Sequence, residues 1–138
     1  MTLENKQIMY DLRDAIIGSA KVVNDFFGKE MCDLDTEYKP KDGDTARTVI
    51  DRYAQDRIHG YLLERYPNAV YNLEETRVNK KTSLKNKLLI FVDPYDGTAN
   101  AQPKLPLSTQ GGIAAKDNKF IAAATLHPFE KYVLYGGK

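Results

Sequence analysis

The chain has 138 residues, of which 42% are hydrophobic and 10% aromatic, and its 20 lysines and arginines balance 19 aspartates and glutamates. These values are typical of one globular domain, and a net charge of +1 gives no bulk attraction to nucleic acid or to an anionic membrane. The single Cys32 excludes an internal disulfide, and no apolar run approaches the ~20 residues of a membrane span. The polar N-terminus lacks the apolar core of a signal peptide, so we expect a cytoplasmic protein.

Two helices are predicted in the first half of the chain. Apolar residues recur every three or four positions from residue 3 to about 27, which predicts an amphipathic helix. Residues 30–44 show no apolar period and are expected to form a long surface loop. Asp44 or Thr45 is then expected to cap a second helix, which ends before Pro67.

The remaining apolar segments are predicted to be strands. Residues 69–73 form a short apolar segment, and residues 88–92 are an unbroken apolar run typical of a strand that is covered on both faces. Three more strands are expected near 108–115, 120–126 and 132–135, joined by turns. Two helices followed by strands in hairpins predict an α+β fold, in which the helices lie on a largely antiparallel sheet.

The strongest chemical signal follows the run at 88–92, where Asp-Pro-Tyr-Asp-Gly-Thr occupies positions Asp93 to Thr98. Two carboxylates after a strand offer hard oxygen ligands of the kind that Mg²⁺ prefers. Pro94 stiffens the turn so that both acids can converge, and the amides of Gly97 and Thr98 could face a phosphate if a helical turn begins there. Aspartate and glycine are also ordinary residues of a solvated turn, so that interpretation stays open.

Two other groups of acids are candidates for the same site. Glu74 and Glu75 follow the apolar segment 69–73, so two strand ends could direct carboxylates to one point, although a charged loop entry explains the pair equally well. Asp51 lies on the second predicted helix, three residues after Thr48, where most acids simply face water. The residues alone therefore leave ligands and solvated acids as alternatives.

The candidate residues follow one another in a recognisable order: Lys41-Asp42-Gly43, Thr48, Asp51, Glu74-Glu75 and Asp93-Pro94-Tyr95-Asp96-Gly97-Thr98. In this order and spacing the chain resembles the inositol monophosphatase family, the Mg²⁺-dependent, lithium-sensitive sugar phosphatases. The resemblance continues through the later strands and spans nearly the whole chain. Because family members have a further α/β half, the resemblance implies that residues 1–138 are one domain, the N-terminal portion of that layered fold without its C-terminal half.

The resemblance implies a site with two or three Mg²⁺ ions. Glu74 and Asp93 would hold one ion together with the backbone carbonyl of Tyr95. Asp96 would hold a second ion, which Asp93 bridges. Glu74 therefore belongs to both the metal-binding and the catalytic residues that the resemblance implies.

The resemblance also implies roles for residues around the ions. Asp51 and Thr98 would polarise the attacking water, and the amides of Gly97 and Thr98 would receive the phosphate oxygens. Glu75 would support the metal ligands. Lys41, in the loop at 30–44, would contact a water near the metal.

The sequence thus predicts a Mg²⁺-dependent phosphomonoesterase that hydrolyses a small phosphorylated metabolite with water as the nucleophile. Inositol phosphate, a nucleotide bisphosphate and a sugar phosphate stay open as substrates. Haloacid dehalogenase-type phosphatases separate their two aspartates by one residue, whereas two residues separate Asp93 from Asp96, which argues against an aspartyl-phosphate mechanism.

A different class of function is also open. A half-length relative that is catalytically incomplete could act as an interaction module that binds metal or phosphate. Neither nucleic acid polymers nor membranes are expected as partners. The expected partners are a second copy in a homodimer, as is usual in the family, or a second chain or segment that supplies the missing half.

Overall fold

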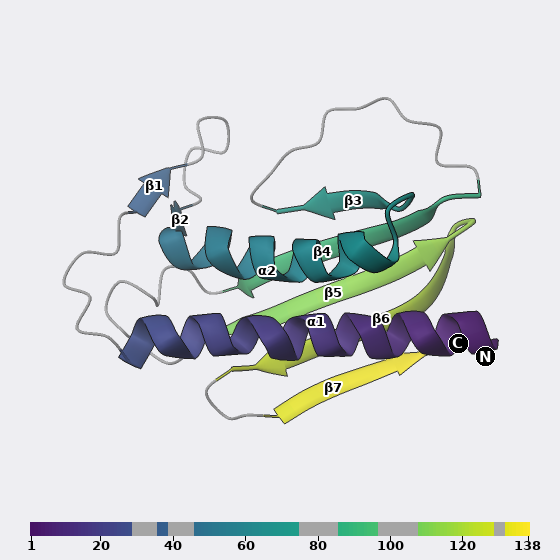
Figure 1. Ribbon diagram of the computed structural model, residues 1–138, viewed down its shortest axis with the longest axis horizontal. Helices are drawn as coiled ribbons and strands as arrows, with labels where there is room; N and C mark the ends of the chain where they lie inside the picture. The colour runs from purple at the N-terminus through teal and green to yellow at the C-terminus, as the bar shows by residue number, and fades with distance from the viewer. Residues whose placement is uncertain (29–35, 39–45, 75–85, 97–107, 129–131) are drawn as a thin grey trace.

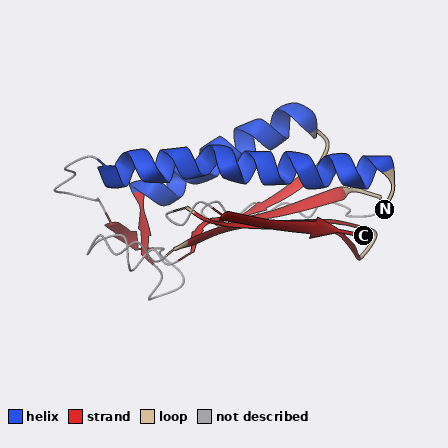
Figure 2. Cartoon of the chain, turned by 90° about the horizontal axis from the view of Figure 1, so that it is seen from below, coloured by secondary structure: helices blue, strands red, loops and turns tan. Residues whose placement is uncertain are grey.

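The computed structural model describes residues 1–28, 36–38, 46–74, 86–96, 108–128 and 132–138. The elements in chain order are α1 (Leu3–Gly28), β1 (Thr36–Tyr38), β2 (Ala46–Thr48), α2 (Val49–Arg65), β3 (Val70–Leu73), β4 (Leu88–Asp96), β5 (Thr109–Lys116), β6 (Lys119–His127) and β7 (Tyr132–Gly137). Strands β3 to β7 form a five-stranded sheet in sequence order, and β1 pairs with β2 separately (Figure 1). Both helices lie on one side of the larger sheet (Figure 2). The predicted α+β fold is confirmed.

The sheet contains one parallel pair followed by antiparallel pairs. Strand β3 runs parallel to β4, with Leu73 opposite Val92, whereas β4, β5, β6 and β7 pair antiparallel in succession. The turn between β5 and β6 contains Asp117 and Asn118, whose φ angles are 51° and 60°. Aspartate and asparagine tolerate this left-handed conformation, which suits a tight hairpin between twisted strands.

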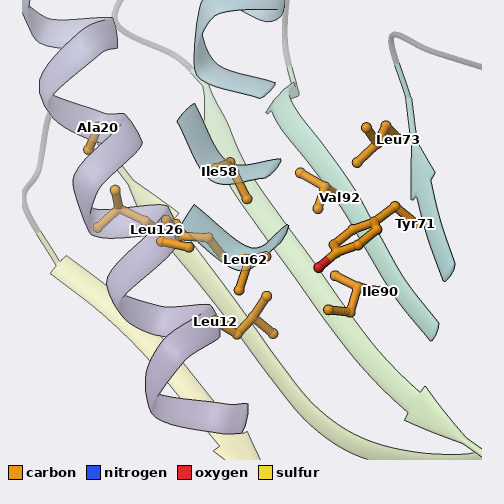
Figure 3. Packing of buried hydrophobic residues seen from close by; sticks show 12 residues of the cluster. Leu12, Ala20, Ile58, Leu62, Tyr71, Leu73, Ile90, Val92 and Leu126 are labelled. Carbon is orange, nitrogen blue, oxygen red and sulfur yellow. The ribbon is translucent and has the colours of Figure 1, made fainter. Parts of the chain in front are cut away.

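The core lies between the helix layer and the sheet. Apolar side chains spaced three or four residues apart on both helices meet the inward side chains of β3, β4 and β6 (Figure 3). The labelled members of this cluster are Leu12, Ala20, Ile58, Leu62, Tyr71, Leu73, Ile90, Val92 and Leu126. Helix α1 approaches the sheet at Gly112, where a Cβ atom would lie 2.8 Å from Cδ1 of Leu12. No helix in the described part of the chain is long and apolar enough to cross a membrane.

The region before α2 differs from the sequence prediction. Part of the predicted loop at 30–44 forms β1, which pairs with β2 so that Thr36 lies opposite Thr48. Helix α2 therefore begins at Val49, later than the predicted start. A three-residue strand is too short to leave a hydrophobic period in the sequence, so this pair gave no signal. Asp44 and Thr45 themselves lie outside the described residues.

Strand β4 also differs from its prediction, in two respects. It continues through Asp96, although it was expected to stop before Asp93. It is also covered on one face only, since Ile90 and Val92 are buried whereas Phe91 is 39% exposed. The run at 88–92 is therefore apolar because both faces of the sheet are apolar here. No described element covers the second face.

Candidate metal site

The parallel pairing of β3 and β4 brings two acidic side chains together. Leu73 lies opposite Val92, so the next residue of each strand, Glu74 and Asp93, reaches the same end of the sheet. The backbone N–H of Glu74 donates to the Val92 carbonyl at 3.2 Å, which extends the pairing by one residue. The carboxyl groups of Glu74 and Asp93 are hydrogen-bonded to each other. Residues that are 19 positions apart in the sequence thus share one acidic pair.

A β-bulge brings Asp96 to the same face of the sheet as Asp93. In a regular strand, side chains three positions apart point to opposite faces. Here Asp93 lies opposite Gly111 and Asp96 lies opposite Thr109, so β4 has one more residue than β5 in this stretch. Because Gly111 and Thr109 are two apart in β5 and cross-strand partners share a face, both aspartates face the same way.

The electrostatics of this acidic group are unfavourable for full ionisation. Burial raises the pKa of Asp93 to about 7 from its usual 3.8, and the hydrogen bond with Glu74 and the negative charges of Glu74 and Asp96 act in the same direction. The backbone N–H of Tyr95 acts in the opposite sense and lowers this pKa. Oδ1 of Asp93 is buried and has no hydrogen-bond partner among the described residues. An acid in this setting is typical of a functional site.

The donors that meet here suit a hard divalent cation. Carboxylate oxygens are preferred Mg²⁺ ligands, and a cation would offset the repulsion between Glu74 and Asp93 and give the buried Oδ1 atom of Asp93 a partner. Within the described ranges, however, no three carboxylate, histidine or cysteine side chains are arranged as a complete metal site. Asp96 is exposed, and its Oδ2 accepts a hydrogen bond from Oγ1 of Thr109 at 3.5 Å. The fit to a cation therefore rests on the Glu74–Asp93 pair.

Asp51 approaches the same end of β4 from the helix layer. It lies in the first turn of α2 and is 1% exposed, so it is not one of the helix acids that face water. Its neighbour across the layers is Tyr95, which is also 1% exposed. Burial raises the pKa of the Tyr95 phenol, the neighbouring Ser108 side chain lowers it, and the charge of Asp51 raises it. Asp51 and Asp93 thus flank the bulge from opposite sides of the sheet.

The other predicted site residues cannot be placed. Glu75, Gly97, Thr98 and Lys41 lie outside the described residues. The amide contacts to phosphate and the contact of Lys41 with a water near the metal therefore stay predictions. The carbonyl of Tyr95 lies in the bulge, and its role as a metal ligand also stays a prediction.

Sequence analysis missed Gln110, which contacts the acidic segment directly. Its side chain is completely buried, and its Nε2 donates to the Pro94 carbonyl at 2.8 Å. A signal was present, because period-two alternation places residue 110 on the inward face of a strand, where an apolar side chain is usual. A glutamine at such a position is informative only when its partner is known.

The acidic pair borders a groove on the uncovered face of the sheet. The groove has a volume of about 860 Å³ and is lined mainly by apolar and small side chains. Glu74 and Asp93 form its polar end, and Phe91, Ile113 and Leu134 contribute its largest apolar side chains. The candidate site is therefore continuous with the open apolar face.

No protein-family model and no curated protein matches the sequence. Solved structures do match. The extragenic suppressor protein suhB of Bartonella henselae is 21% identical with a TM-score of 0.81, over 96% of this chain and 49% of that chain. The Thermotoga maritima IMPase is 20% identical with a TM-score of 0.77, over 96% of this chain and 48% of that chain. A staphylococcal inositol monophosphatase, soaked in lithium chloride as an inhibitory complex, is 18% identical with a TM-score of 0.79, over 99% and 50%. The chain spans about half the length of these structures and has their fold over that half.

Proposed function

We propose that the chain carries part of the active site of a Mg²⁺-dependent phosphomonoesterase of the inositol monophosphatase type. The observation that supports this most directly is the Glu74–Asp93 carboxyl pair in a chain of this fold, since Oδ1 of Asp93 has no hydrogen-bond partner in the described part of the chain. Similar structures add chemical context. One is an IMPase/NADP phosphatase with NADP and Ca²⁺, another holds Mg²⁺ and phosphate, and a third, SaIMPase-II, binds inositol monophosphate.

In this proposal each acid near the bulge has a separate task. Glu74 and Asp93 would hold one Mg²⁺ together with the Tyr95 carbonyl, and Asp96 would hold a second ion. When bound, Mg²⁺ makes water more acidic and offsets the charge of the transferring phosphoryl group. The task of polarising the attacking water is assigned to Asp51 from the resemblance alone, because the described structure places its buried carboxyl on the helix side of the bulge.

The remaining tasks fall to residues outside the described ranges. Thr98 shares the orientation of water with Asp51, and the amides of Gly97 and Thr98 bind phosphate oxygens. Glu75 supports the metal ligands, and Lys41 contacts a water at the site. The substrate is a small phosphorylated metabolite, with inositol phosphate, a nucleotide bisphosphate and a sugar phosphate as candidates.

One observation favours a second candidate function. The described residues bring Glu74 and Asp93 together but hold no complete three-ligand metal site. A chain with these properties suits an interaction module that binds a cation or phosphate without turnover. The two functions differ in whether cation binding is accompanied by hydrolysis.

Metal binding and phosphate release together test the proposal. The sample is the complete protein, including any segment or partner chain that supplies a second half. Calorimetry at pH 7.5 is expected to detect Mg²⁺ and Mn²⁺ binding, and a panel of small phosphate esters is expected to release phosphate only with Mg²⁺ and not with EDTA. Binding without turnover would support the module instead. A well-folded sample that takes up neither a divalent cation nor inorganic phosphate would contradict both functions.

The uncovered face of the sheet has the features of an interface with a partner. Phe91, Ile113 and Leu134 are 39%, 38% and 62% exposed, and Phe91 lies directly opposite Ile113 in the sheet. Exposed apolar side chains that form a continuous groove are typical of an interface. The matching structures have about as many residues again as this chain covers. We therefore propose that a second α/β unit of similar length packs its apolar side on this face, next to the acidic pair.

The substitution Ile113→Asp tests this interface. It places a charge in the centre of the proposed contact, so the complete protein is expected to lose at least about 2 kcal/mol of stability in urea unfolding. Leu63→Asp is the matched control, because Leu63 is similarly exposed, at 42%, but lies on α2 in the helix layer. Equal effects of the two substitutions would contradict the interface. A dimer of this chain that Ile113→Asp dissociates would identify a second copy as the occupant and contradict the proposed partner.

A further inference from the structure

Gln110 lies opposite the bulge that aligns Asp93 with Asp96. In β5 it is the single residue between Gly111 and Thr109, and these two pair with Asp93 and Asp96. Pro94 and Tyr95 of β4 therefore share one partner position. Backbone groups in a bulge lose their regular ladder partners, so they need others if they are buried. Gln110 is 0% exposed and points to the helix layer, where it reaches Ser19 of α1.

The side-chain amide of Gln110 joins the bulge to helix α1. Its Nε2 donates one hydrogen bond to the Pro94 carbonyl at 2.8 Å and another to Oγ of Ser19 at 2.9 Å. The Ser19 hydroxyl donates in turn to the Ile16 carbonyl at 2.9 Å, which fixes the acceptor that Gln110 uses. A primary amide nitrogen carries two N–H groups, so one side chain can serve both acceptors at once. The carbonyl between the two acidic residues is thereby connected to the core of the protein.

The oxygen of the same amide lowers the stability of the folded protein. Oε1 of Gln110 is buried without a hydrogen-bond partner among the described residues. A buried acceptor in that state destabilises the fold, and an apolar side chain of the same length would avoid the penalty. The acceptor side of the amide therefore does not explain why a glutamine occupies this position. Its donor side does, because it binds the Pro94 carbonyl within the bulge.

We propose that Gln110 is a positioning residue for the Asp93–Asp96 acid pair. By holding the Pro94 carbonyl toward the helix layer, it keeps the bulge in β4 and with it the common orientation of the two carboxylates. In a regular register Asp96 would turn to the other face and leave Asp93. This inference rests on the proposed function for its consequence, the binding of a divalent cation, but the geometry of the bulge can be tested without a cation.

The substitution Gln110→Met tests the proposal, because methionine keeps the length of the side chain and removes both donors. The complete protein is titrated with Mg²⁺ and Mn²⁺ by calorimetry, and its unfolding is followed in parallel. We expect Gln110→Met to remain folded and to bind both cations at least about tenfold more weakly. Ser19→Ala is the matched control, since it removes one hydrogen bond of the same amide but leaves the bond to Pro94. Its cation affinity is expected to stay within about twofold.

A second readout does not depend on the metal. The crystal structure of the cation-free Gln110→Met protein is expected to show the bulge lost or shifted and the Asp96 carboxylate away from Asp93. If the methionine variant does not fold, Gln110→Leu replaces it in both measurements. An intact bulge with unchanged cation affinity would overturn the proposal, as would equal losses of affinity in Gln110→Met and Ser19→Ala. If the unsubstituted protein binds no cation, the proposed function fails, whereas the variant structure still decides whether Gln110 holds the bulge.

Discussion

Replacing Asp93 by asparagine is expected to lower Mg²⁺-dependent phosphate release by the complete protein at least about 100-fold. Asparagine keeps the size of the side chain but removes the charge from the group that contacts Glu74 and whose buried oxygen has no partner within the described ranges. In the proposed site Asp93 would be one of the two side chains, with Glu74, that hold the first ion, so its loss is expected to weaken the site strongly. Rates are measured over a range of Mg²⁺ concentrations, so that weaker cation binding is separated from slower turnover.

Asp117→Asn provides the control for this prediction. Asp117 lies in the β5–β6 turn, next to Lys116, which pairs with Leu88 at the opposite end of β4 from Asp93. Its φ of 51° is one that asparagine adopts readily, so the turn is expected to tolerate the change. Activity of the control is expected to match that of the unsubstituted protein. Equal rates for Asp93→Asn and Asp117→Asn would remove Asp93 from the mechanism.

The helices and the order of the strands could be predicted because their signals are local. The apolar side chains of α1 recur with helical spacing, and the two-residue turn at Asp117 and Asn118 is typical of a hairpin. Whether both faces of β4 are covered could not be predicted in the same way. An apolar run shows that both faces of a strand avoid water, but it does not show whether the second cover belongs to the same stretch of chain. The exposure of Phe91 shows that no described element covers this face of β4.

The candidate site likewise has some features that local sequence patterns predict and others that they do not. The acidic segment from Asp93 to Asp96 is visible in the sequence because its residue types are unusual after an apolar strand. The proximity of Glu74 to Asp93 depends on the parallel pairing of β3 and β4, between which the segment 75–85 lies in the sequence. No local pattern shows which strands will pair. The common orientation of the two aspartates depends on a bulge in β4. The hydrogen bond from Gln110 to the Pro94 carbonyl is formed within that bulge, so it could not be predicted either. The features of the site that depend on strand pairing and on the bulge therefore leave no local pattern in the sequence.

The acidic pair also predicts an unusual dependence of stability on pH. The pKa of Asp93 is raised from 3.8 to about 7 in the folded protein, so the folded state holds this proton more tightly than the unfolded chain. The contribution of Asp93 to the free energy of unfolding is therefore most favourable below pH 4. It declines between pH 4 and about 7, by an amount on the order of a few kcal/mol, and is constant above that. Urea unfolding at intervals from pH 4 to 8, without divalent cations, measures this decline.

The substitution Asp93→Asn separates this effect from the titration of the other acids. Asparagine has no proton to lose, so relative to the unsubstituted protein the variant is expected to gain stability as the pH rises from 4 to 8. Mg²⁺ is expected to restore the unsubstituted protein at pH 8, because a bound cation favours the ionised pair, and to leave the variant almost unchanged. Parallel pH curves for the two proteins would show that Asp93 ionises normally in the fold. If the curves differ as expected, Asp93 destabilises the cation-free protein and serves the proposed catalysis for one reason, because a divalent cation offsets both the burial of its charge and the repulsion from Glu74.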